Sequence, residues 1–437
     1  MKFKGLLVLI FLSGRLFSLA ETGDTLHLSV AVSMALDKNY SITLAQNNLE
    51  IARINNSPGN AGMLPKLDIT GTRSRAQNNS HMEYFDGRTR DGKNAVTNVT
   101  NAGMQLSWTF FDGFNMFIQR DKLNQLEEMS NVQLQSVVEN TVSQVIRVYF
   151  EIAAQQKLAE VYQEAMKISH ERLVFSKARF NLGAGSELGI LQAMVDLSAD
   201  SANFIRQMAL VKNLKADLNF LLCRNLDTLF DVERNIPLRD DIVYEDVRKK
   251  MDDENPELRL ARNEVDLSSL AIRELRTAHY PKLSLNSSYS YNKQKAEIGI
   301  YNLNRNLGLN VGVTLSYNIF NGFTNRQKID AARIRQESAL TGLKLLKHEQ
   351  ETSLLQIFND YQTNLQLVNF ETENLSFANR NFSIAKERYK LGAITDVELR
   401  ETQKKLMDAE NRLLMARFRC KSAEIELLRL SGQLSKE

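Results

Sequence analysis

The sequence has little cysteine, proline and tryptophan, and it carries almost no net charge. Only 2 cysteines and 5 prolines occur in 437 residues, and 55 Lys+Arg face 52 Asp+Glu. Two cysteines cannot form the disulfide framework on which small secreted domains depend. A balanced charge gives no electrostatic argument for binding nucleic acid, whose phosphates require an extensive basic surface. Neither His170 nor His348 has a second histidine at the spacing of a zinc-protease motif.

Long apolar runs are also missing beyond the first twenty residues. Residues 1–20 combine two early lysines, the stretch GLLVLIFL and a Ser18-Leu19-Ala20 ending, which is the pattern of a secretory signal peptide. No cysteine follows the apolar stretch, so a lipoprotein signal is not indicated. After it, no segment approaches the roughly 20 apolar residues of a membrane helix. We therefore expect an exported chain that meets a bilayer by another route.

The chain is a tandem duplication. Three matches share an offset of 209: Trp108 with Tyr317, FDGF (111–114) with FNGF (320–323), and Gly183 with Gly392. Upstream the offset is 216, with Pro65 matching Pro281, so seven extra residues lie between Pro65 and Trp108. The predicted segments are a signal peptide at 1–20, a first repeat at 21–225 and a second repeat at 226–437.

Each repeat predicts a long helix and a shorter returning helix. About 70 residues without proline separate FDG or FNG from the turn glycine, and from Phe358 to Tyr389 the large side chains step by three and four. At 1.5 Å per residue such a helix is about 100 Å long, far beyond a globular helix. The predicted spans are about 113–182 and 322–391 for the long helices, and 186–222 and 395–431 for the returning ones.

Between the proline and FDG or FNG, the hydrophobic period changes from 3.6 to 2. From Leu307 to Ile319, apolar residues alternate with Asn, Gly, Thr and Ser, which predicts strands with one apolar and one polar face. We expect two strands within 66–111 and two within 282–320, each of 9 to 14 residues, with hairpin loops at 78–96 and 293–305. Five aromatic residues gather where the strands end, as in an interfacial girdle: Trp108, Phe110, Phe111, Tyr317 and Phe320.

Four strands of membrane length leave two alternatives. A half-buried antiparallel sheet in a soluble protein would show the same period. In a membrane, four strands cannot close a barrel, and each unpaired backbone group in lipid costs several kcal/mol. Two chains would give eight strands with a filled interior, and three would give twelve with room for a passage.

The order of these features, found twice, resembles the TolC-type outer-membrane efflux protein family. It runs helix, Asn-Pro-like break, helix, Leu-Pro-x-Leu, strand pair, Phe-Asp-Gly, long helix, Gly-x-x-Ser/Thr turn and returning helix. The resemblance implies a mixed α/β membrane protein. In its homotrimer, each chain gives four strands to a twelve-stranded outer-membrane β-barrel and its coiled-coil helices to a periplasmic α-helical barrel. It implies a non-enzymatic exit duct of a tripartite efflux pump or type I secretion system.

The same resemblance implies the partners and no cofactor. The partners are a periplasmic adaptor, an inner-membrane RND, ABC or MFS transporter, and outer-membrane lipid, without nucleic acid. Adaptor docking at the periplasmic tip falls on the two turns: Arg179, Gly183, Ser186, Arg388, Gly392 and Thr395. Independently of the family, a glycine with positive φ ends a helix and Ser or Thr caps the next one. Four further residues mark the junctions between helices and strands: Pro65, Gly113, Pro281 and Gly322.

Two carboxylates complete the sites that the resemblance implies. Family members commonly place acidic residues six and nine positions after the second-repeat glycine, which here are Glu398 and Glu401. Three copies would form two negative rings that favour cations at a tip constriction. A solvated surface pair is the alternative interpretation. Ile394 stands where some members carry a latch arginine, so that latch is not expected here.

Two rival functions remain open at this point. An enzyme finds little support, because no nucleophile and base stand in a recognisable pattern and no metal-ligand or other catalytic motif occurs. A soluble periplasmic coiled-coil structural or adaptor protein would explain the helices and the signal, but not four strands that end in aromatic residues. The Ser57-Pro58-Gly59 segment predicts a kink in a first-repeat helix, with no functional explanation.

Overall fold

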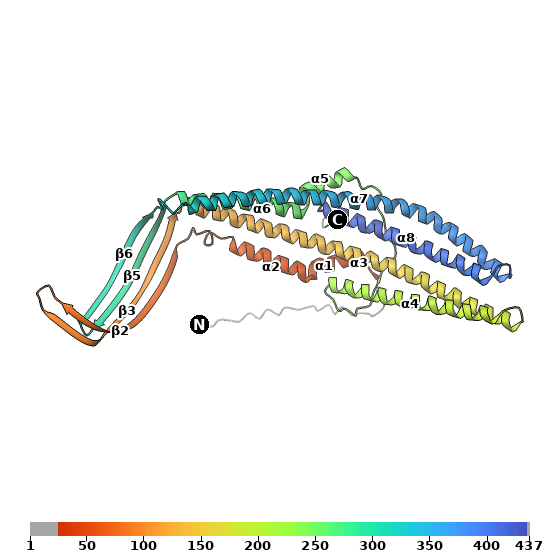
Figure 1. The fold of residues 1–437 in the computed structure, drawn as a ribbon, viewed down its shortest axis with the longest axis horizontal. Helices are drawn as coiled ribbons and strands as arrows, with labels where there is room; N and C mark the ends of the chain where they lie inside the picture. The colour runs from red at the N-terminus through yellow and green to blue at the C-terminus, as the bar shows by residue number, and fades with distance from the viewer. Residues whose placement is uncertain (1–24, 435–437) are drawn as a thin grey trace, which may run out of the picture. The chain divides into compact units, whose positions relative to one another are not determined.

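The computed structural model describes residues 25–434 and falls into two compact units that each combine segments of both repeats (Figure 1). We call residues 25–37, 144–238 and 363–422 the turn unit, and 38–143, 239–362 and 423–434 the sheet unit. The predicted signal peptide lies outside the described residues. Within 25–434, no helix combines the length and apolar character needed to cross a membrane.

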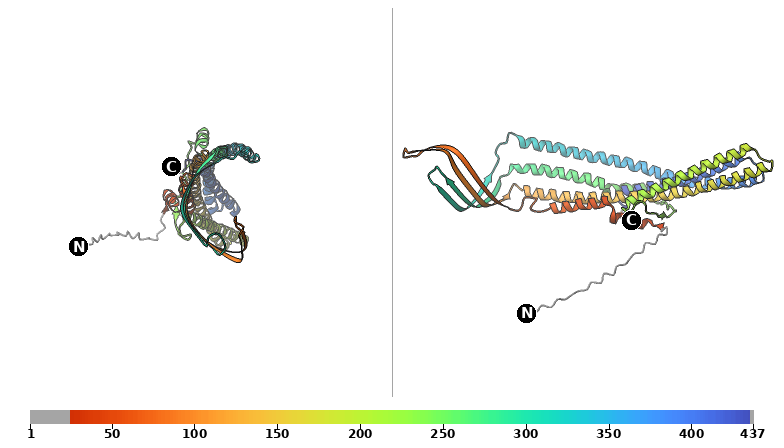
Figure 2. Two further views of the ribbon diagram at one scale, coloured as in Figure 1. Left: turned by 90° about the vertical axis from the view of Figure 1, so that its left-hand side faces the viewer. Right: turned by 90° about the horizontal axis from the view of Figure 1, so that it is seen from below.

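The turn unit is built from two antiparallel helical hairpins. The helices α3 (Asn115–Asn181) and α7 (Thr324–Lys390) have 67 residues each, and their C-terminal halves belong to this unit. The helix α4 (Glu187–Leu221) returns beside α3, and α8 (Asp396–Leu430) returns beside α7 (Figures 1 and 2). No proline interrupts any of these helices, so every interior backbone donor keeps its i−4 acceptor.

The core of the turn unit lies between these hairpins. One cluster joins Ile168 of α3 to Phe382, Ala385 and Tyr389 of α7 and to Leu399 of α8. Farther along, Val368, Leu413 and Ala416 pack together. The short parallel strands β1 (Thr25–Leu26) and β4 (Asp231–Val232) are held by the buried Tyr149, whose hydroxyl donates to the Leu26 carbonyl at 2.8 Å. The helix α1 (Leu28–Lys38) follows β1.

The sheet unit contains one antiparallel four-stranded sheet, in the order β2-β3-β5-β6 (Figure 1). The strands are β2 (Lys66–Glu83), β3 (Thr89–Phe111), β5 (Lys282–Ala296) and β6 (Leu303–Ser316). The two hairpins share a register, because Lys66 pairs with Ser107 and the equivalent Lys282 pairs with Ser316. The seven extra residues of the first repeat therefore extend the far end of the β2–β3 hairpin.

The predicted strand lengths and hairpin loops were wrong. The strands β2, β3 and β5 have 18, 23 and 15 residues, longer than the expected 9 to 14. Segment 78–96 is mostly paired strand with a bulge between Asn78 and Ser80, and only 84–88 connect β2 to β3. Polar residues there resemble a loop, but cross-strand hydrogen bonds are available to any side chain that tolerates extended backbone.

The helices that precede the strands start at equivalent asparagines. Asn39 caps α2 (Tyr40–Asn55) by accepting from the Ser41 amide at 2.9 Å, and Asn255 caps α6 (Pro256–Arg276) by accepting from the Glu257 amide at 2.9 Å. The helix α5 (Tyr244–Glu254) precedes α6, and the 3-10 helix η1 (Thr277–His279) follows it. Capping oxygens satisfy amides that lack intrahelical partners.

The expected kink at Ser57-Pro58-Gly59 is instead a helix end. The helix α2 stops at Asn55, and turns occupy the residues up to Pro65, where the amide of Met63 donates to the Pro58 carbonyl at 3.0 Å. The indole of Trp108 on β3 donates to the Met63 carbonyl at 3.0 Å and so ties these turns to the sheet. Pro65 and Pro281 directly precede β2 and β5.

Candidate functional site at the helical turns

The turns that close the two hairpins of the turn unit have the same backbone structure. Gly183 has φ +73° and Gly392 has φ +74°. The Ala184 amide donates to the Arg179 carbonyl and the Ala393 amide donates to the Arg388 carbonyl, each at 2.9 Å. This six-to-one bond, with a glycine in the left-handed region, is a Schellman motif that ends each long helix. Residues Arg179 and Arg388 thus supply the same backbone acceptor in the two repeats.

The next helix begins differently in the two repeats. Ser186 caps α4, with its hydroxyl accepting from the Gly189 amide at 3.2 Å. Thr395 accepts from the Glu398 amide at 3.2 Å, and the Glu398 carboxylate accepts in return from the Thr395 amide at 2.7 Å. This reciprocal pair is a capping box. Hydrogen bonds from the Thr395 amide and hydroxyl lower the pKa of Glu398, so its carboxylate is charged and held against its own helix.

The second predicted carboxylate, Glu401, lies on the same helix and is exposed. Its carboxylate forms an ion pair with Lys405, one turn later, at 3.5 Å. Glu398 and Glu401 therefore have different surroundings, because one caps the helix and the other has only a mobile lysine beside it. The side chain of Arg179 folds back over its turn and donates to the Ala184 carbonyl at 3.4 Å.

Just behind the turns, a buried ion cluster joins the two hairpins. Arg172 of α3 is 3% exposed and donates to Asp396 of α8 at 3.0 Å and to Asp196 of α4 at 3.1 Å. Arg400 of α8 makes a two-pronged contact with Asp200 of α4 at 2.6 and 2.8 Å. Two-pronged pairs between arginine and carboxylate fix orientation as well as distance. The cluster therefore holds α3, α4 and α8 in one arrangement.

Neutral side chains complete this cluster. The hydroxyl of Ser169 donates to Asp200 at 2.6 Å, and that of Tyr389 donates to Asp396 at 3.1 Å. The side-chain amide of Gln403 accepts from Arg400 through its oxygen at 3.1 Å and donates to the Ala165 carbonyl through its nitrogen at 3.1 Å. Burial alone would lower the pKa of Arg172, but the hydrogen bonds and charges of Asp396 and Asp196 outweigh it and raise the pKa. Arg172 is therefore a permanent cation in a dry site.

Sequence reasoning missed this cluster. Its charged members lie on long helices that also carry many exposed charges, so residue type alone does not reveal their burial. One signal was present, because the cluster breaks the repeat. Arg400 is equivalent to Leu191, and Asp196 is equivalent to Lys405. When a charged residue in one repeat matches an apolar residue, or a residue of opposite charge, in the other repeat, that position indicates a specific partner of its own.

An apolar groove of about 450 Å³ lies between α4 and α8 beside the turns. Its apolar walls are Leu188, Leu191 and Val195 from α4 and Val397 from α8, which are 53 to 68% exposed. The Asp196 and Arg400 side chains of the cluster and Glu401 border it. Large exposed apolar side chains around a groove mark a surface that another element covers.

The sheet unit carries the aromatic residues that the sequence placed at the strand ends. Trp108 and Phe110 are exposed on β3, Phe111 ends that strand, and Tyr317 and Phe320 follow β6 with 55 and 71% exposure. Gly113 has φ +72° and Gly322 has φ +64°, and each is followed by a phenylalanine that also has positive φ. These two left-handed residues turn the chain from strand to helix in both repeats.

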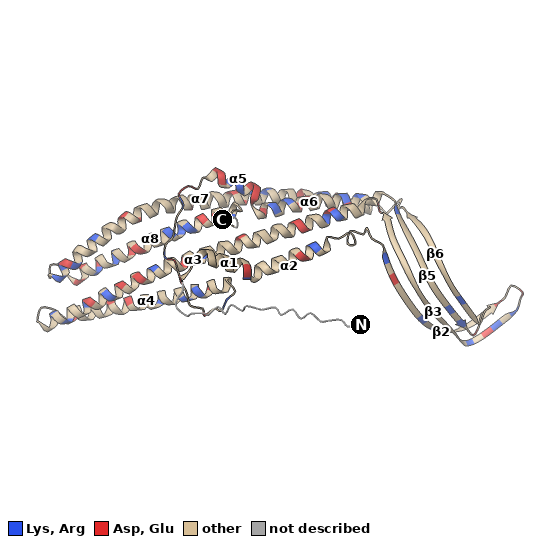
Figure 3. Ribbon diagram, turned by 180° about the vertical axis from the view of Figure 1, so that it is seen from behind, with Lys and Arg blue, Asp and Glu red and all other residues tan. Residues whose placement is uncertain are grey.

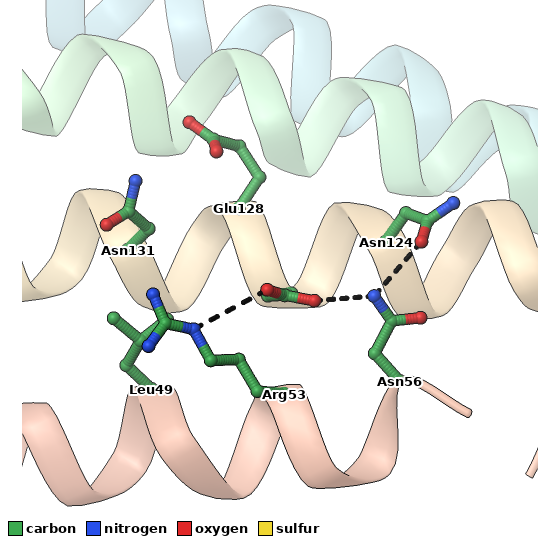
Figure 4. A pocket seen from close by; sticks show the side chains of 7 residues that line it. Leu49, Arg53, Asn56, Asn124, Glu128 and Asn131 are labelled. Atoms are coloured by element: carbon green, nitrogen blue, oxygen red, sulfur yellow. Dashed lines mark hydrogen bonds and ion pairs between the residues drawn. The ribbon is translucent and has the colours of Figure 1, made fainter.

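A second, polar cavity of about 190 Å³ lies in the sheet unit between α2 and α3 (Figure 4). Asn56, which directly follows α2, donates to Asn124 of α3 at 3.0 Å, and Arg53 of α2 pairs with Glu127 at 3.7 Å (Figure 4). These contacts join two helices and leave no nucleophile activated. Within residues 25–434, no group of three or more His, Cys, Asp or Glu side chains is placed to hold a metal ion.

Comparison with known proteins identifies the family. The family described as "Outer membrane efflux protein" matches residues 31–223 and 247–433, one span in each repeat. The outer membrane protein TolC of Salmonella enteritidis is 20% identical over 339 residues, which cover 75% of this chain and 68% of that protein. The pyoverdine export outer membrane protein OpmQ of Pseudomonas aeruginosa is 27% identical over 191 residues, which cover 42% of this chain and 37% of that protein.

Solved structures support the same fold. The Campylobacter jejuni CmeC outer membrane channel superposes with a TM-score of 0.77 at 18% identity, over 93% of this chain and 85% of that one. The fold similarity and the family match cover both repeats. The chain therefore belongs to the outer membrane efflux protein family, whose members are export channels of the outer membrane and not enzymes.

Proposed function

We propose that three copies of this chain form one export duct and share a twelve-stranded barrel. The sheet supports this most directly. Within the described residues, β2 and β6 each have one neighbouring strand, so both edges are open. In lipid every unpaired edge group costs several kcal/mol, so the edges need partners. Twelve strands leave a passage, whereas eight are filled by side chains.

The duplication predicts how the open edges pair. At the internal seam, Gly103 of β3 stands opposite Ser290 of β5. The equivalent residues are Gly312 of β6 and Ser74 of β2, by the offsets of 209 and 216. If the seam between copies repeats the internal one, Gly312 of one copy lies opposite Ser74 of the next. The same residue types then meet at both seams.

Cross-linking tests this arrangement. In a background without Cys223 and Cys420, the Ser74→Cys/Gly312→Cys variant should form disulfide-linked dimers and trimers in outer-membrane fractions. The control Ser74→Cys/Gly308→Cys is four residues out of register, so its sulfur atoms are too far apart. Equal cross-linking of both variants would contradict the register. The mass of the detergent-extracted protein is the independent test, because a monomer that is soluble without detergent would contradict the duct itself.

The two turns and the groove between α4 and α8 are the proposed docking site for a periplasmic adaptor. Arg179, Gly183, Ser186, Arg388, Gly392 and Thr395 form the rigid ends of the two hairpins, and the exposed leucines and valines beside them offer apolar contact area. An adaptor with a helical hairpin would fit such a groove by placing one apolar helix face in it. The partner beyond it would be an inner-membrane RND, ABC or MFS transporter, in an efflux pump or a type I secretion system.

Photo-cross-linking would locate this docking site. A photoreactive residue at Leu188 should capture the adaptor encoded beside this chain's gene, and one at Leu340 on the sheet-unit part of α7 should not. Both leucines are exposed, so accessibility alone would not separate them. Capture at Leu340 and not at Leu188 would move the docking site away from the turns.

The cargo remains the choice of the transporter in this proposal. The polar face of the sheet carries Asn, Ser, Thr and Gly, which solvate many solutes without forming a specific pocket. OpmQ exports pyoverdine, so a small secreted metabolite is one candidate. The proposed negative rings of Glu398 and Glu401 would favour cations over anions of similar size. Family membership does not support the soluble periplasmic alternative.

A further inference from the structure

Five basic residues share one face of the sheet near its hairpin end. We name Arg73, Arg75, Lys293, Lys295 and Arg305 the basic belt. We propose that this belt binds the phosphate groups of lipid headgroups in the outer leaflet of the outer membrane. The inference rests on the proposed function, in which this sheet crosses that membrane.

The strand register places these residues together. In one row across the sheet, Arg73 pairs with Thr100, Thr100 with Lys293, and Lys293 with Arg305. The next row towards the hairpin ends contains Arg75, Asn98, Lys295 and Leu303. Directly paired residues point to the same face of a sheet, and so do residues two apart on one strand. The five cations therefore occupy two adjacent rows of one face. In Figure 3, blue Lys and Arg segments lie on the strands near their hairpin ends.

This face is the apolar one. The row before the belt contains Gly71, Ala102, Tyr291 and Leu307, and the row before that contains Ile69, Met104, Tyr289 and Leu309. The aliphatic residues Ile69, Leu307 and Leu309 are 63 to 75% exposed. A barrel that faces lipid needs such an apolar band. The belt begins at the row where the band ends, which is where lipid headgroups would lie.

The position of the belt along the strands selects the leaflet. Each strand pair is entered from a helix, since β2 follows α2 and β3 leads directly into α3. The belt lies at the opposite end, next to the hairpin connections. With the helices in the periplasm, that end faces the outside. The phosphates in question are therefore those of the outer leaflet, where the headgroups belong to phosphorylated glycolipid.

The charges of the belt have no partner within the protein. In the segments 66–78, 95–111, 282–296 and 303–316, which leave out the far end of the β2–β3 hairpin, the sole acidic residue is Asp68. Asp68 lies on the opposite face, as its pairing with Gln105 shows. Among residues 25–434, none of the five cations takes part in an ion pair. Lys293 and Arg305 even stand directly opposite each other, an arrangement that destabilises a sheet unless an anion lies between them.

The polar face argues that the belt does not serve cargo. Its equivalent rows contain Thr72, Asn101, Asn292 and Asn306, and none of these is charged. A cation needed for transport would belong on that face, which would line the passage. Long basic side chains at the border of an apolar band instead extend towards headgroups. The lipid phosphate is therefore the anion that fits.

The test measures lipid binding by the purified trimer in neutral detergent. Bisphosphorylated lipid A and its dephosphorylated form are titrated and followed by native mass spectrometry. The Arg73→Gln/Lys293→Gln/Arg305→Gln variant should bind bisphosphorylated lipid A on the order of 100-fold more weakly, given the usual contribution of each basic residue at a membrane surface. The charge-matched control Arg88→Gln/Arg90→Gln/Lys93→Gln, in the part of the β2–β3 hairpin that extends beyond β5, should bind as the unchanged protein does. The charge-preserving Arg73→Lys/Lys293→Arg/Arg305→Lys variant should retain binding.

Each outcome decides the proposal. Equal affinity for bisphosphorylated and dephosphorylated lipid A would overturn it. So would an equal loss of affinity in the Arg73→Gln/Lys293→Gln/Arg305→Gln variant and in the hairpin control. Full inhibition by millimolar inorganic phosphate without lipid binding would indicate a free anion as the ligand and would also overturn it. The mass of the protein in the same spectra separates the two ideas, because a monomer in place of a trimer would contradict the proposed duct. An intact trimer without phosphate preference would contradict the belt alone.

Discussion

At the residue scale, charged residues inside the ion cluster are expected to contribute more to stability than charged residues outside it. Arg172 has two carboxylate partners and is nearly inaccessible, whereas Arg179, two turns later on the same helix, is part-exposed, donates to one carbonyl and lies over the Phe175 ring, with no carboxylate partner among the described residues. Removing one member of a buried ion pair leaves its partner charged without compensation, which costs about 3–5 kcal/mol. A surface charge costs about 1 kcal/mol or less. The two arginines therefore provide a matched comparison.

We expect Arg172→Gln to lower the free energy of unfolding by about 3 kcal/mol, because the part-buried Asp396 loses its cation and the part-buried Asp196 keeps only Arg400, at 3.5 Å. Arg179→Gln should lower it by about 1 kcal/mol or less. Urea unfolding of the detergent-solubilised protein, followed by circular dichroism at 222 nm, measures both. Similar midpoints for the two variants would show that the cluster is not held in a dry site.

Glu410 differs from Arg172, because its surroundings disfavour its charged form. It lines a cavity between α3, α7 and α8, and burial raises its pKa, opposed by Lys157 and helped by Glu164. A carboxyl whose folded pKa is raised contributes stability that is fully present below its unfolded pKa of about 4.5 and is lost as the pH rises through the folded value.

Glu410→Gln should therefore stabilise the protein at pH 7 and have no such advantage at pH 4, where the wild-type carboxyl is protonated. The unfolding midpoint, measured in parallel at the two pH values, checks this prediction. Glu164→Gln is the control on the same cavity, since the side chain of Glu164 is 62% exposed and pairs with Lys167. A constant difference between Glu410→Gln and wild type across this pH range would contradict the assignment.

At the element scale, the strand–helix junction repeats in sequence but not in its surroundings. Gly113 and Gly322 both have positive φ, which strains any residue with a side chain by about 1–2 kcal/mol. A Cβ on Gly113 would lie 2.6 Å from the Cβ of Tyr280 and 2.8 Å from the Thr277 carbonyl oxygen. A Cβ on Gly322 meets nothing within 4 Å. The same turn therefore occurs twice, once packed against Thr277 and Tyr280 at Gly113 and once without a close neighbour at Gly322.

Gly113→Ala should consequently destabilise more than Gly322→Ala. The second variant has only the cost of positive φ, about 1 kcal/mol, whereas the first must also displace backbone of the η1 turn. Thermal unfolding of the detergent-solubilised protein, followed by circular dichroism at 222 nm, measures both variants. Equal losses would mean that the Tyr280 contact gives way at no cost.

The elements also show how far the sequence could be interpreted. Hydrophobic period and the turn glycines predicted where the long helices and strands occur, because both follow from local spacing. The lengths of β2 and β3 were underestimated, since most residues from Asn78 to Asp91 are polar and their pairing depends on a facing strand. The ion cluster was missed for the same reason, as Arg172 and Asp396 are 224 residues apart. Contacts set by tertiary structure leave no periodic signal.

At the scale of the whole molecule, the duplication gives the chain two similar hairpins, while the acidic positions occur in the second alone. Glu398 and Glu401 have Gly189 and Gln192 at the equivalent positions. In a trimer, a negative ring would therefore come three times from α8 and never from α4. Glu398 already caps its helix, and Glu401 has Lys405 beside it. The net charge of a ring thus depends on Glu401 and on how far Lys405 neutralises it.

Single-channel recordings in planar bilayers test this dependence through ion selectivity. Glu401→Gln should reduce the preference for potassium over chloride, and Lys405→Gln should increase it, because the second change leaves the carboxylate uncompensated. Both effects should shrink at 1 M salt, where screening acts within about 3 Å. Glu398→Gln should lower thermal stability through the lost charged cap more than it changes selectivity. If Glu401→Gln and Lys405→Gln shift the reversal potential in the same direction, the carboxylate does not face the ion path.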